Sequence, residues 1–197
     1  MNIQTRIAEI LAAEAAAISA VRVTPAFEEA VQALRDSTGK VLTTGMGKAG
    51  HVARKFASTL CSTGTPASYV HPGEAAHGDL GLIGPDDCIV VFSTSGKTRE
   101  VLEMLELGRH LGLKTVIGIT SHPDSSLRSL SNIVLDMGIL TEPCTHGLTP
   151  SSSTTVMLAI SDALALVLME LKGITREDFG RRHHGGYLGR KAGTDRE

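Results

Sequence analysis

The chain has 197 residues, of which 42% are hydrophobic and 20% charged, a balance typical of a globular protein that buries one core. A formal net charge of −2 gives no general attraction to nucleic acid or to an anionic membrane surface. Cys61, Cys88 and Cys144 are widely spaced and form no CxxC pair, which argues against a disulfide framework and a cysteine-rich zinc site. The first residues lack the pattern of a signal peptide. We therefore expect a cytoplasmic protein without nucleic-acid or membrane partners.

Two helices are predicted before the first strand. The first covers residues 3–20 and carries an apolar stripe that Glu14 interrupts. The second begins at Pro25. The stripe of the first helix consists of Ile3, Ile7, Ile10, Leu11, Ala15 and Ile18, and the second helix contains Phe27, Ala30, Val31 and Leu34.

Strands that are apolar on both faces then alternate with helices. The predicted strands cover residues 40–44, 67–70, 88–93, 114–120 and 132–136, and the predicted helices cover 48–62, 98–111, 125–130 and 154–171. This alternation predicts an α/β fold, a three-layer sandwich with a five-stranded parallel sheet between helices. The last helix has Asp162 as its one interior charge before Glu170, and we expect a core helix rather than a membrane span. A single domain over residues 1–197 is expected, with its core at about 5–192 and a polar tail at 190–197.

In an open parallel sheet, ligands bind beyond the carboxyl ends of the strands, so the polar loops at these ends are the candidate sites. The first loop, TGMGKAGH at residues 44–51, matches the GxGxxG pattern. A dinucleotide site also needs an acidic residue at the end of the next strand, where Val70 and His71 stand instead. In one alternative, the backbone at Gly47 approaches a small ligand closely and Lys48 supplies a cation beside it. In the other, Lys48 is simply a lysine exposed to solvent.

The second loop, STSGKTRE at residues 93–100, predicts a phosphate site. Four hydroxyl side chains precede the free N–H groups and positive dipole end of a helix. These side chains belong to Ser93, Thr94, Ser95 and Thr98. Val91 stands where a P-loop has glycine, which argues against a nucleotide-triphosphate site. The alternative is a plain helix cap, which explains one hydroxyl rather than four.

The third loop, TEPCTHGLTPSSSTT at residues 141–155, places several hydroxyls at the start of the long helix. Its Glu142 is either a catalytic carboxylate or a solvated one. Histidines occur in two further polar segments, without the spacing of a metal site, and a role in acid–base chemistry is favoured over a bound metal. These histidines are His71, His77, His183 and His184.

Taken together, these segments resemble a known family in the same order along the chain. GMGKAGH, CSTGTPASYVHPGEAAHGDLG, the Ser-x-Ser-Gly loop, LTPSSSTT and HHGGYLGR are similar to SIS (sugar isomerase) domains of the arabinose-5-phosphate isomerase type. The resemblance covers roughly residues 5–192, and HPGEAAHGDLG is its most specific part. Longer members continue into a pair of CBS domains, and this chain resembles a short form without them.

The resemblance implies a flavodoxin-like SIS fold, a homotetramer with sites at subunit interfaces, and two sets of site residues. The implied catalytic set is Lys48, Glu100, Glu142 and His183. The implied substrate site consists of Ser93, Thr94, Ser95, Thr98, Ser152 and Ser153, with Gly47 in the first loop and His77 at the rim. Many members have asparagine and glutamate where this chain has Thr94 and Lys97, and proline where it has His184, so either His183 or His184 is the working histidine.

The function expected from the sequence is aldose–ketose isomerisation of a sugar phosphate, with arabinose 5-phosphate and ribulose 5-phosphate as the pair, through an enediol and without cofactor or metal. His183 would assist ring opening, Glu142 would move the proton between C2 and C1, Lys48 would stabilise the enediolate, and Glu100 would position them. The alternatives are an isomerase of another sugar phosphate and a non-catalytic sugar-phosphate sensor.

Overall fold

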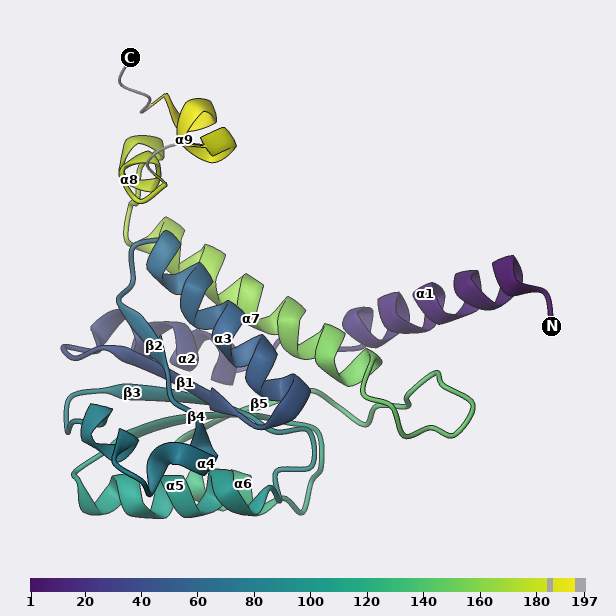
Figure 1. Cartoon of the computed structure of the whole chain (residues 1–197), viewed down its shortest axis with the longest axis horizontal. Coiled ribbons are helices and arrows are strands. Elements are labelled where there is room, and N and C mark those ends of the chain that lie inside the picture. Colours follow the sequence, from purple (N-terminus) through teal and green to yellow (C-terminus); the bar gives the residue numbers. More distant parts are fainter. Residues whose placement is uncertain (184–185, 194–197) are drawn as a thin grey trace.

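A five-stranded, all-parallel sheet forms the centre of the computed structural model, which describes residues 1–183 and 186–193 (Figure 1). The strands follow the order β2-β1-β3-β4-β5 across the sheet. Their bounds are β1 Val41–Gly45, β2 Ala67–Tyr69, β3 Cys88–Phe92, β4 Thr115–Thr120 and β5 Ile133–Asp136. The parallel five-stranded sheet predicted from the sequence is therefore confirmed, with strand bounds that differ by one residue or less.

The position of β3 in the middle of the sheet explains why its sequence is apolar throughout. Val90 and Phe92 point into the core on one face of the sheet, whereas Ile89 and Val91 point into the core on the other. Successive side chains of a strand alternate between faces, so a strand covered on both sides needs apolar residues at every position.

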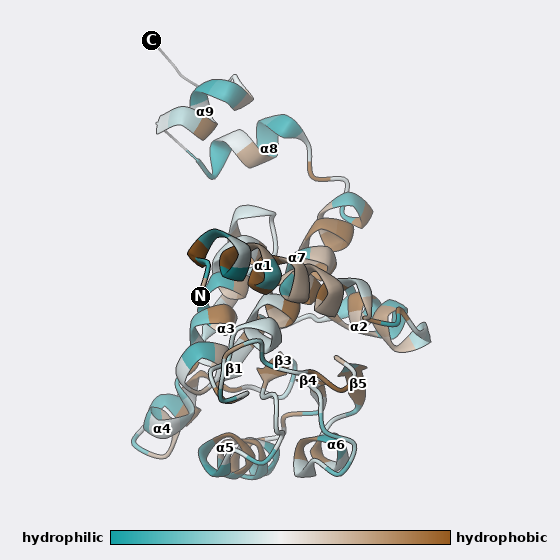
Figure 2. Ribbon diagram, turned by 90° about the vertical axis from the view of Figure 1, so that its right-hand side faces the viewer, coloured by the Kyte–Doolittle hydropathy of each residue, from teal (hydrophilic) through white to brown (hydrophobic). Residues whose placement is uncertain are grey.

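Helices cover both faces of the sheet (Figure 2). One layer contains α2 (Pro25–Asp36), α3 (Gly47–Ser62) and α7 (Ser152–Leu171), and the other contains α4 (Pro72–Ala75), α5 (Arg99–His110) and α6 (Ser126–Leu130). A short 3-10 helix, η1, covers Asp79–Leu82. The sequence did not predict α4 or η1, because elements of four residues are too short to display a helical period.

The long helix α7 packs in the core through Val156, Met157, Ile160, Leu164 and Leu168. By length and composition alone it could cross a membrane, and 39% of its most apolar 18-residue window is buried in the protein. Leu166, Val167 and Leu171 remain exposed on its outer side.

Three helices lie at the two ends of the sandwich. The first, α1 (Ile3–Ser19), extends away from the body beside the start of α7 (Figure 1). The other two, α8 (Arg176–Arg181) and α9 (Gly186–Ala192), follow the C-terminal end of α7. All residues of α1 are described, and none of them is buried. The sequence did not predict α8, which begins with a capping box between Thr175 and Asp178, or α9.

Candidate active site

The first glycine loop joins β1 to α3 at the carboxyl end of the sheet. Gly47 and Lys48 form the first turn of α3, and a Cβ at Gly50 would lie 2.5 Å from the carbonyl oxygen of Gly45. Glycine at position 50 is therefore required for the close packing of α3 against β1, so packing accounts for part of the GxGxxG pattern without a nucleotide. The turn directs Lys48 towards a cavity.

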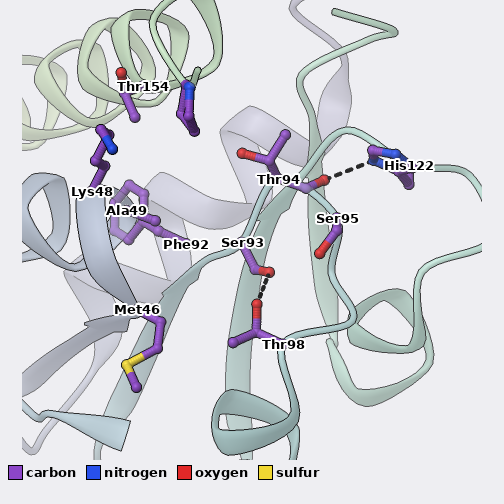
Figure 3. Close-up of a pocket in the computed structure, with 11 residues that line it drawn as sticks. Met46, Lys48, Ala49, Phe92, Ser93, Thr94, Ser95, Thr98, His122 and Thr154 are labelled. Carbon is purple, nitrogen blue, oxygen red and sulfur yellow. Dashed lines mark hydrogen bonds between the residues drawn. The ribbon is translucent and has the colours of Figure 1, made fainter. Parts of the chain in front are cut away.

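This cavity, of about 310 Å³, is formed by the ends of β1, β3 and β4 together with the start of α7 (Figure 3). Lys48 and Thr154 lie on one side of it, and Ser93, Ser95 and Thr98 lie on the other. Met46, Ala49, Phe92, Thr94, His122 and Pro150 complete the lining. The cavity thus combines one ammonium group with several hydroxyls at the end of the sheet where ligands of this fold class bind.

The loop between β3 and α5 holds its hydroxyls through short local bonds. The Oγ of Ser93 lies 3.0 Å from the Oγ1 of Thr98 and also accepts the N–H of Gly96 at 3.1 Å. The Oγ of Ser95 accepts the N–H of Lys97 at 3.2 Å, so its own hydrogen remains available to a ligand.

The start of α5 is open to an anion. Its N-cap residue is Thr98, whose side chain makes no capping bond within the described part of the chain because it is paired with Ser93. The first N–H groups of a helix have no partners inside the helix and carry its positive dipole end. A phosphate placed here would receive both these N–H groups and the loop hydroxyls.

The loop is also held from the neighbouring strand, β4. The carbonyl oxygen of Thr94 accepts the N–H of Ser121 at 3.0 Å and the hydroxyl of Thr120 at 3.2 Å. It also lies 3.1 Å from Nδ1 of His122, and because a carbonyl oxygen only accepts, this contact requires the proton on Nδ1. Gly96 adopts a φ of 60°, and a Cβ there would lie 2.3 Å from that of Ser125. These contacts fix the loop before any ligand arrives.

Glu142 caps the start of α7. Its Oε2 accepts the N–H of Ser151 at 2.8 Å, and its Oε1 accepts the N–H of Ser153 at 3.2 Å. The hydroxyls of Ser152 and Ser153 are buried and find no hydrogen-bond partner among the described residues. The start of α7 is therefore occupied by a carboxylate of the same chain, in contrast to the open start of α5.

The loop that follows Glu142 contains a cysteine, Cys144, whose thiol accepts several hydrogen bonds. The Sγ of Cys144 accepts the N–H groups of Leu148 and Thr149, each at 3.3 Å. Hydrogen bonds from Thr149 first, and then from Leu148 and His146, lower the pKa of Cys144 to about 6. The thiolate is therefore its main form at neutral pH.

Several residues predicted for the site do not line the cavity in the described part of the chain: Gly47, His77, Glu100, Glu142, Ser152, Ser153 and His183. Glu100 lies half-buried in the first turn of α5, and His77 is exposed between α4 and η1. His183 stacks on Phe179 with ring centroids 3.9 Å apart, and its Nδ1 lies 2.8 Å from the Phe179 carbonyl oxygen. It follows α8, at the far end of a 20-residue helix that is about 30 Å long. His184 lies outside the described residues.

Two residues were missed by the sequence reasoning. His122 follows β4 at the same end of the sheet as the other loops, and that position alone could have marked it. Glu14 interrupts the apolar stripe of α1, and it contacts the start of α7 through the hydroxyls of Ser151 and Thr155. No group of three His, Cys, Asp or Glu side chains in residues 1–183 and 186–193 is arranged to hold a metal ion.

Comparisons with known proteins give the family. Residues 33–167 match the model of the SIS domain family. The arabinose 5-phosphate isomerase KdsD of Pseudomonas aeruginosa is 47% identical over 165 residues, which are 84% of this chain and 50% of that protein. The KdsD of Escherichia coli K12 is 46% identical over 153 residues, 78% of this chain and 46% of that protein. The chain thus spans about half the length of the curated relatives it matches.

Two solved structures share the fold and much of the sequence. A putative phosphosugar isomerase involved in capsule formation, from Bacteroides fragilis, has a TM-score of 0.91 and 44% identity, over 94% of this chain and 100% of that one. A protein of Escherichia coli CFT073, in complex with arabinose 5-phosphate, has a TM-score of 0.86 and 39% identity, over 93% of this chain and 100% of that one. From the matched residues, the parallel sheet and these relatives, we conclude that the chain belongs to the SIS domain family.

Proposed function

We propose that the protein is an aldose–ketose isomerase of sugar phosphates, and that it interconverts arabinose 5-phosphate and ribulose 5-phosphate. The curated relatives carry the name of this activity, and the Escherichia coli CFT073 structure holds arabinose 5-phosphate. The observation that carries the proposal is that the open start of α5 and the ammonium of Lys48 face the same cavity. A phosphate bound at α5 leaves the sugar carbons directed towards Lys48 and the start of α7.

In this mechanism the phosphate is held by Ser93, Ser95 and Thr98, with Thr94 and Gly47 beside it. The hydrogen bonds within the loop support this role, because they order its hydroxyls in advance. Ser152 and Ser153, at the start of α7, are proposed to support the site, and His77 is proposed for its rim. No cofactor takes part in the reaction, since proton transfer through an enediol needs only an acid, a base and stabilisation of the negative charge.

Glu142 is the proposed base that moves the proton between C1 and C2. Its carboxylate is held by two N–H groups next to Thr154, a residue that lines the cavity, which supports its placement near the sugar. Lys48 stabilises the negative charge that develops on the enediolate oxygen, and Glu100 positions the reacting groups from the first turn of α5.

His183 is the proposed acid and base for ring opening, and it requires a second copy of the chain. In one chain it lies at the opposite end of α7 from the cavity, so a neighbouring copy has to supply it. We therefore propose a cytoplasmic homotetramer with sites at subunit interfaces. The exposed apolar side chains of α1 and α7 support this assembly, because they include Ile3 and Leu11, exposed by 67% and 63%, and Leu171, exposed by 55%.

Incubation with ribulose 5-phosphate in heavy water tests the proposal. Nuclear magnetic resonance should show arabinose 5-phosphate appearing with deuterium at C2, because the base exchanges its proton with solvent before returning it. A different aldose would indicate another sugar-phosphate substrate. Binding without any aldose would indicate a non-catalytic sugar-phosphate domain and would reject the enzyme.

A further inference from the structure

Helix α1 turns Arg6 and Glu14 towards the protein and leaves much of its apolar stripe exposed. The half-buried positions of the helix are Arg6, Ile10, Ala13, Glu14 and Ala17, whereas Ile3, Ile7 and Leu11 are exposed. Burial of charged side chains is unfavourable unless they find partners. The partners of Arg6 and Glu14 therefore explain why this face is directed inwards.

Glu14 binds the residue that also holds Glu142. The Oε1 of Glu14 accepts the hydroxyl of Ser151, and its Oε2 accepts the hydroxyl of Thr155 at 3.1 Å. The N–H of the same Ser151 donates to the Oε2 of Glu142 at 2.8 Å. One serine thus connects the two carboxylates through its hydroxyl on one side and its amide on the other.

Arg6 holds the opposite end of the same loop. Its guanidinium donates to the carbonyl oxygen of Pro143, the residue directly after Glu142, and also pairs with Glu9 at 2.9 Å. Arg6 and Glu14 are eight residues apart, which is about 12 Å along the helix. The two side chains therefore attach α1 to both ends of the segment from Pro143 to Ser151.

The middle of the segment is exposed. Residues 145–150 are exposed, and a segment with few buried contacts opens more readily than the core. Ser151 is also held by α7, because its carbonyl oxygen accepts from Thr154 and Thr155, and the bonds from Arg6 and Glu14 add restraint at the two ends of the segment. The position of the Glu142 carboxylate depends on both ends.

We propose that Glu14 is a positioning residue, which holds the Glu142 carboxylate in place through Ser151 while Arg6 fixes the other end of the loop. The inference rests on the proposed function, in which Glu142 is the base. It gives α1, which precedes the matched segment at residue 33, a role in the active site. A base displaced by about 1 Å can lose roughly 100-fold in rate while the phosphate remains bound at α5.

Kinetics of three variants test this role. Glu14→Ala removes both bonds, Glu14→Gln keeps the shape and one acceptor, and Ser151→Ala removes the connecting hydroxyl but keeps the amide that donates to Glu142. We expect kcat for arabinose 5-phosphate to fall about 10- to 100-fold in Glu14→Ala and Ser151→Ala, and less in Glu14→Gln, with KM within about threefold of the parent. Glu29→Gln, at an exposed glutamate of α2, is the matched control and should leave both constants unchanged.

A double variant separates positioning from a general loss of stability. If Glu14 acts through Glu142, Glu14→Ala adds no further loss to Glu142→Gln. A merely structural role would instead lower the melting temperature and leave kcat unchanged well below it. A kcat within twofold of the parent in Glu14→Ala, or the full loss repeated on top of Glu142→Gln, would overturn the proposal.

Hydrogen–deuterium exchange gives a readout that does not depend on turnover. Exchange in the segment 144–153 should be faster in Glu14→Ala, while the segment 93–99 exchanges as in the parent. Unchanged exchange in 144–153 would reject the anchoring. Absence of activity in the parent protein would instead reject the proposed function, and the exchange comparison would still decide whether Glu14 holds the loop.

Discussion

The hydroxyls of Ser93 and Thr98 lie 3.0 Å apart, and this pairing leaves the start of α5 without a side-chain cap in the described part of the chain. A threonine at this position ordinarily accepts an N–H of the helix that it precedes. Here the N–H groups remain available to an anion beside Lys48. The start of α7 is occupied instead by the Glu142 carboxylate. One helix start is thus open for a phosphate, and the other holds a carboxylate.

Loss of the Ser95 hydroxyl should weaken phosphate binding. Ser95→Ala removes one donor to a charged group, worth about 1.5–3 kcal/mol, so KM for arabinose 5-phosphate should rise about 10- to 100-fold with a smaller change in kcat. Steady-state kinetics measure both constants. Ser129→Ala, at an exposed serine of α6, is the control. An unchanged KM in Ser95→Ala would remove this residue from the phosphate site.

Replacement of the proposed base should abolish turnover and spare binding. Glu142→Gln retains the shape of the side chain but cannot take up the proton, so kcat should fall about 10²- to 10⁴-fold. Calorimetry should still detect binding of arabinose 5-phosphate near the parent affinity. Turnover within about tenfold of the parent would mean that another group is the base.

His122 should affect binding through the loop that it supports. Its Nδ1 contacts the Thr94 carbonyl oxygen, and its ring lines the cavity. Loss of a hydrogen bond worth about 1 kcal/mol should raise KM about fivefold in His122→Ala. His110→Ala, at the exposed end of α5, is the matched control. The same KM in both variants would show that His122 does not support the site.

The three cysteines should differ in reactivity. Because hydrogen bonds lower the pKa of Cys144 to about 6, its thiolate dominates above that pH and its alkylation should be half-maximal near pH 6. Cys88 is buried, and burial raises its pKa to about 12, so it should be modified only on unfolding. Mass spectrometry after treatment with iodoacetamide at about pH 5–8 follows each site. Slower labelling of Cys144 than of the exposed Cys61 near neutral pH would contradict the expected thiolate.

Asp87 should contribute to stability at neutral pH. Burial acts to raise its pKa, but hydrogen bonds from the Lys40 ammonium and from the amides of Lys40 and Gly84 outweigh it and hold the pKa below its usual value. The contribution is therefore present above about pH 4, the unfolded pKa, and is lost as pH falls through the lower folded value. Asp87→Asn should cost about 1–3 kcal/mol at pH 7, measured by urea unfolding, and less at pH 3. An equal cost at both values would contradict the role of its charge.

The strands and the hydroxyl-rich loop between β3 and α5 could be predicted from the sequence, because their signals are local. A strand such as residues 88–92 is apolar at every position because both of its faces are buried. The hydroxyl residues around Gly96 are close together in the sequence. The orientation of α1 could not be predicted in this way. Its stripe suggested a buried apolar face. Arg6 and Glu14 face inwards because they bind Pro143 and Ser151, and these partners could not be foreseen because each lies 137 residues further along the chain.

The placement of His183 was equally beyond the sequence. The family resemblance implies a role for His183, but only the structure shows that it lies at the opposite end of α7 from the cavity that Lys48 lines. The same holds for Glu142. Its bonds to Ser151 and Ser153 depend on how the loop returns to the helix start.

A crystal structure of the Glu142→Gln variant with arabinose 5-phosphate tests the central claim most directly. We predict the phosphate against Ser95 and the start of α5, with the substituted amide at position 142 within about 3.5 Å of C1 or C2. A phosphate bound away from α5, or an amide at position 142 that is remote from the sugar in every copy of the assembly, would contradict the account.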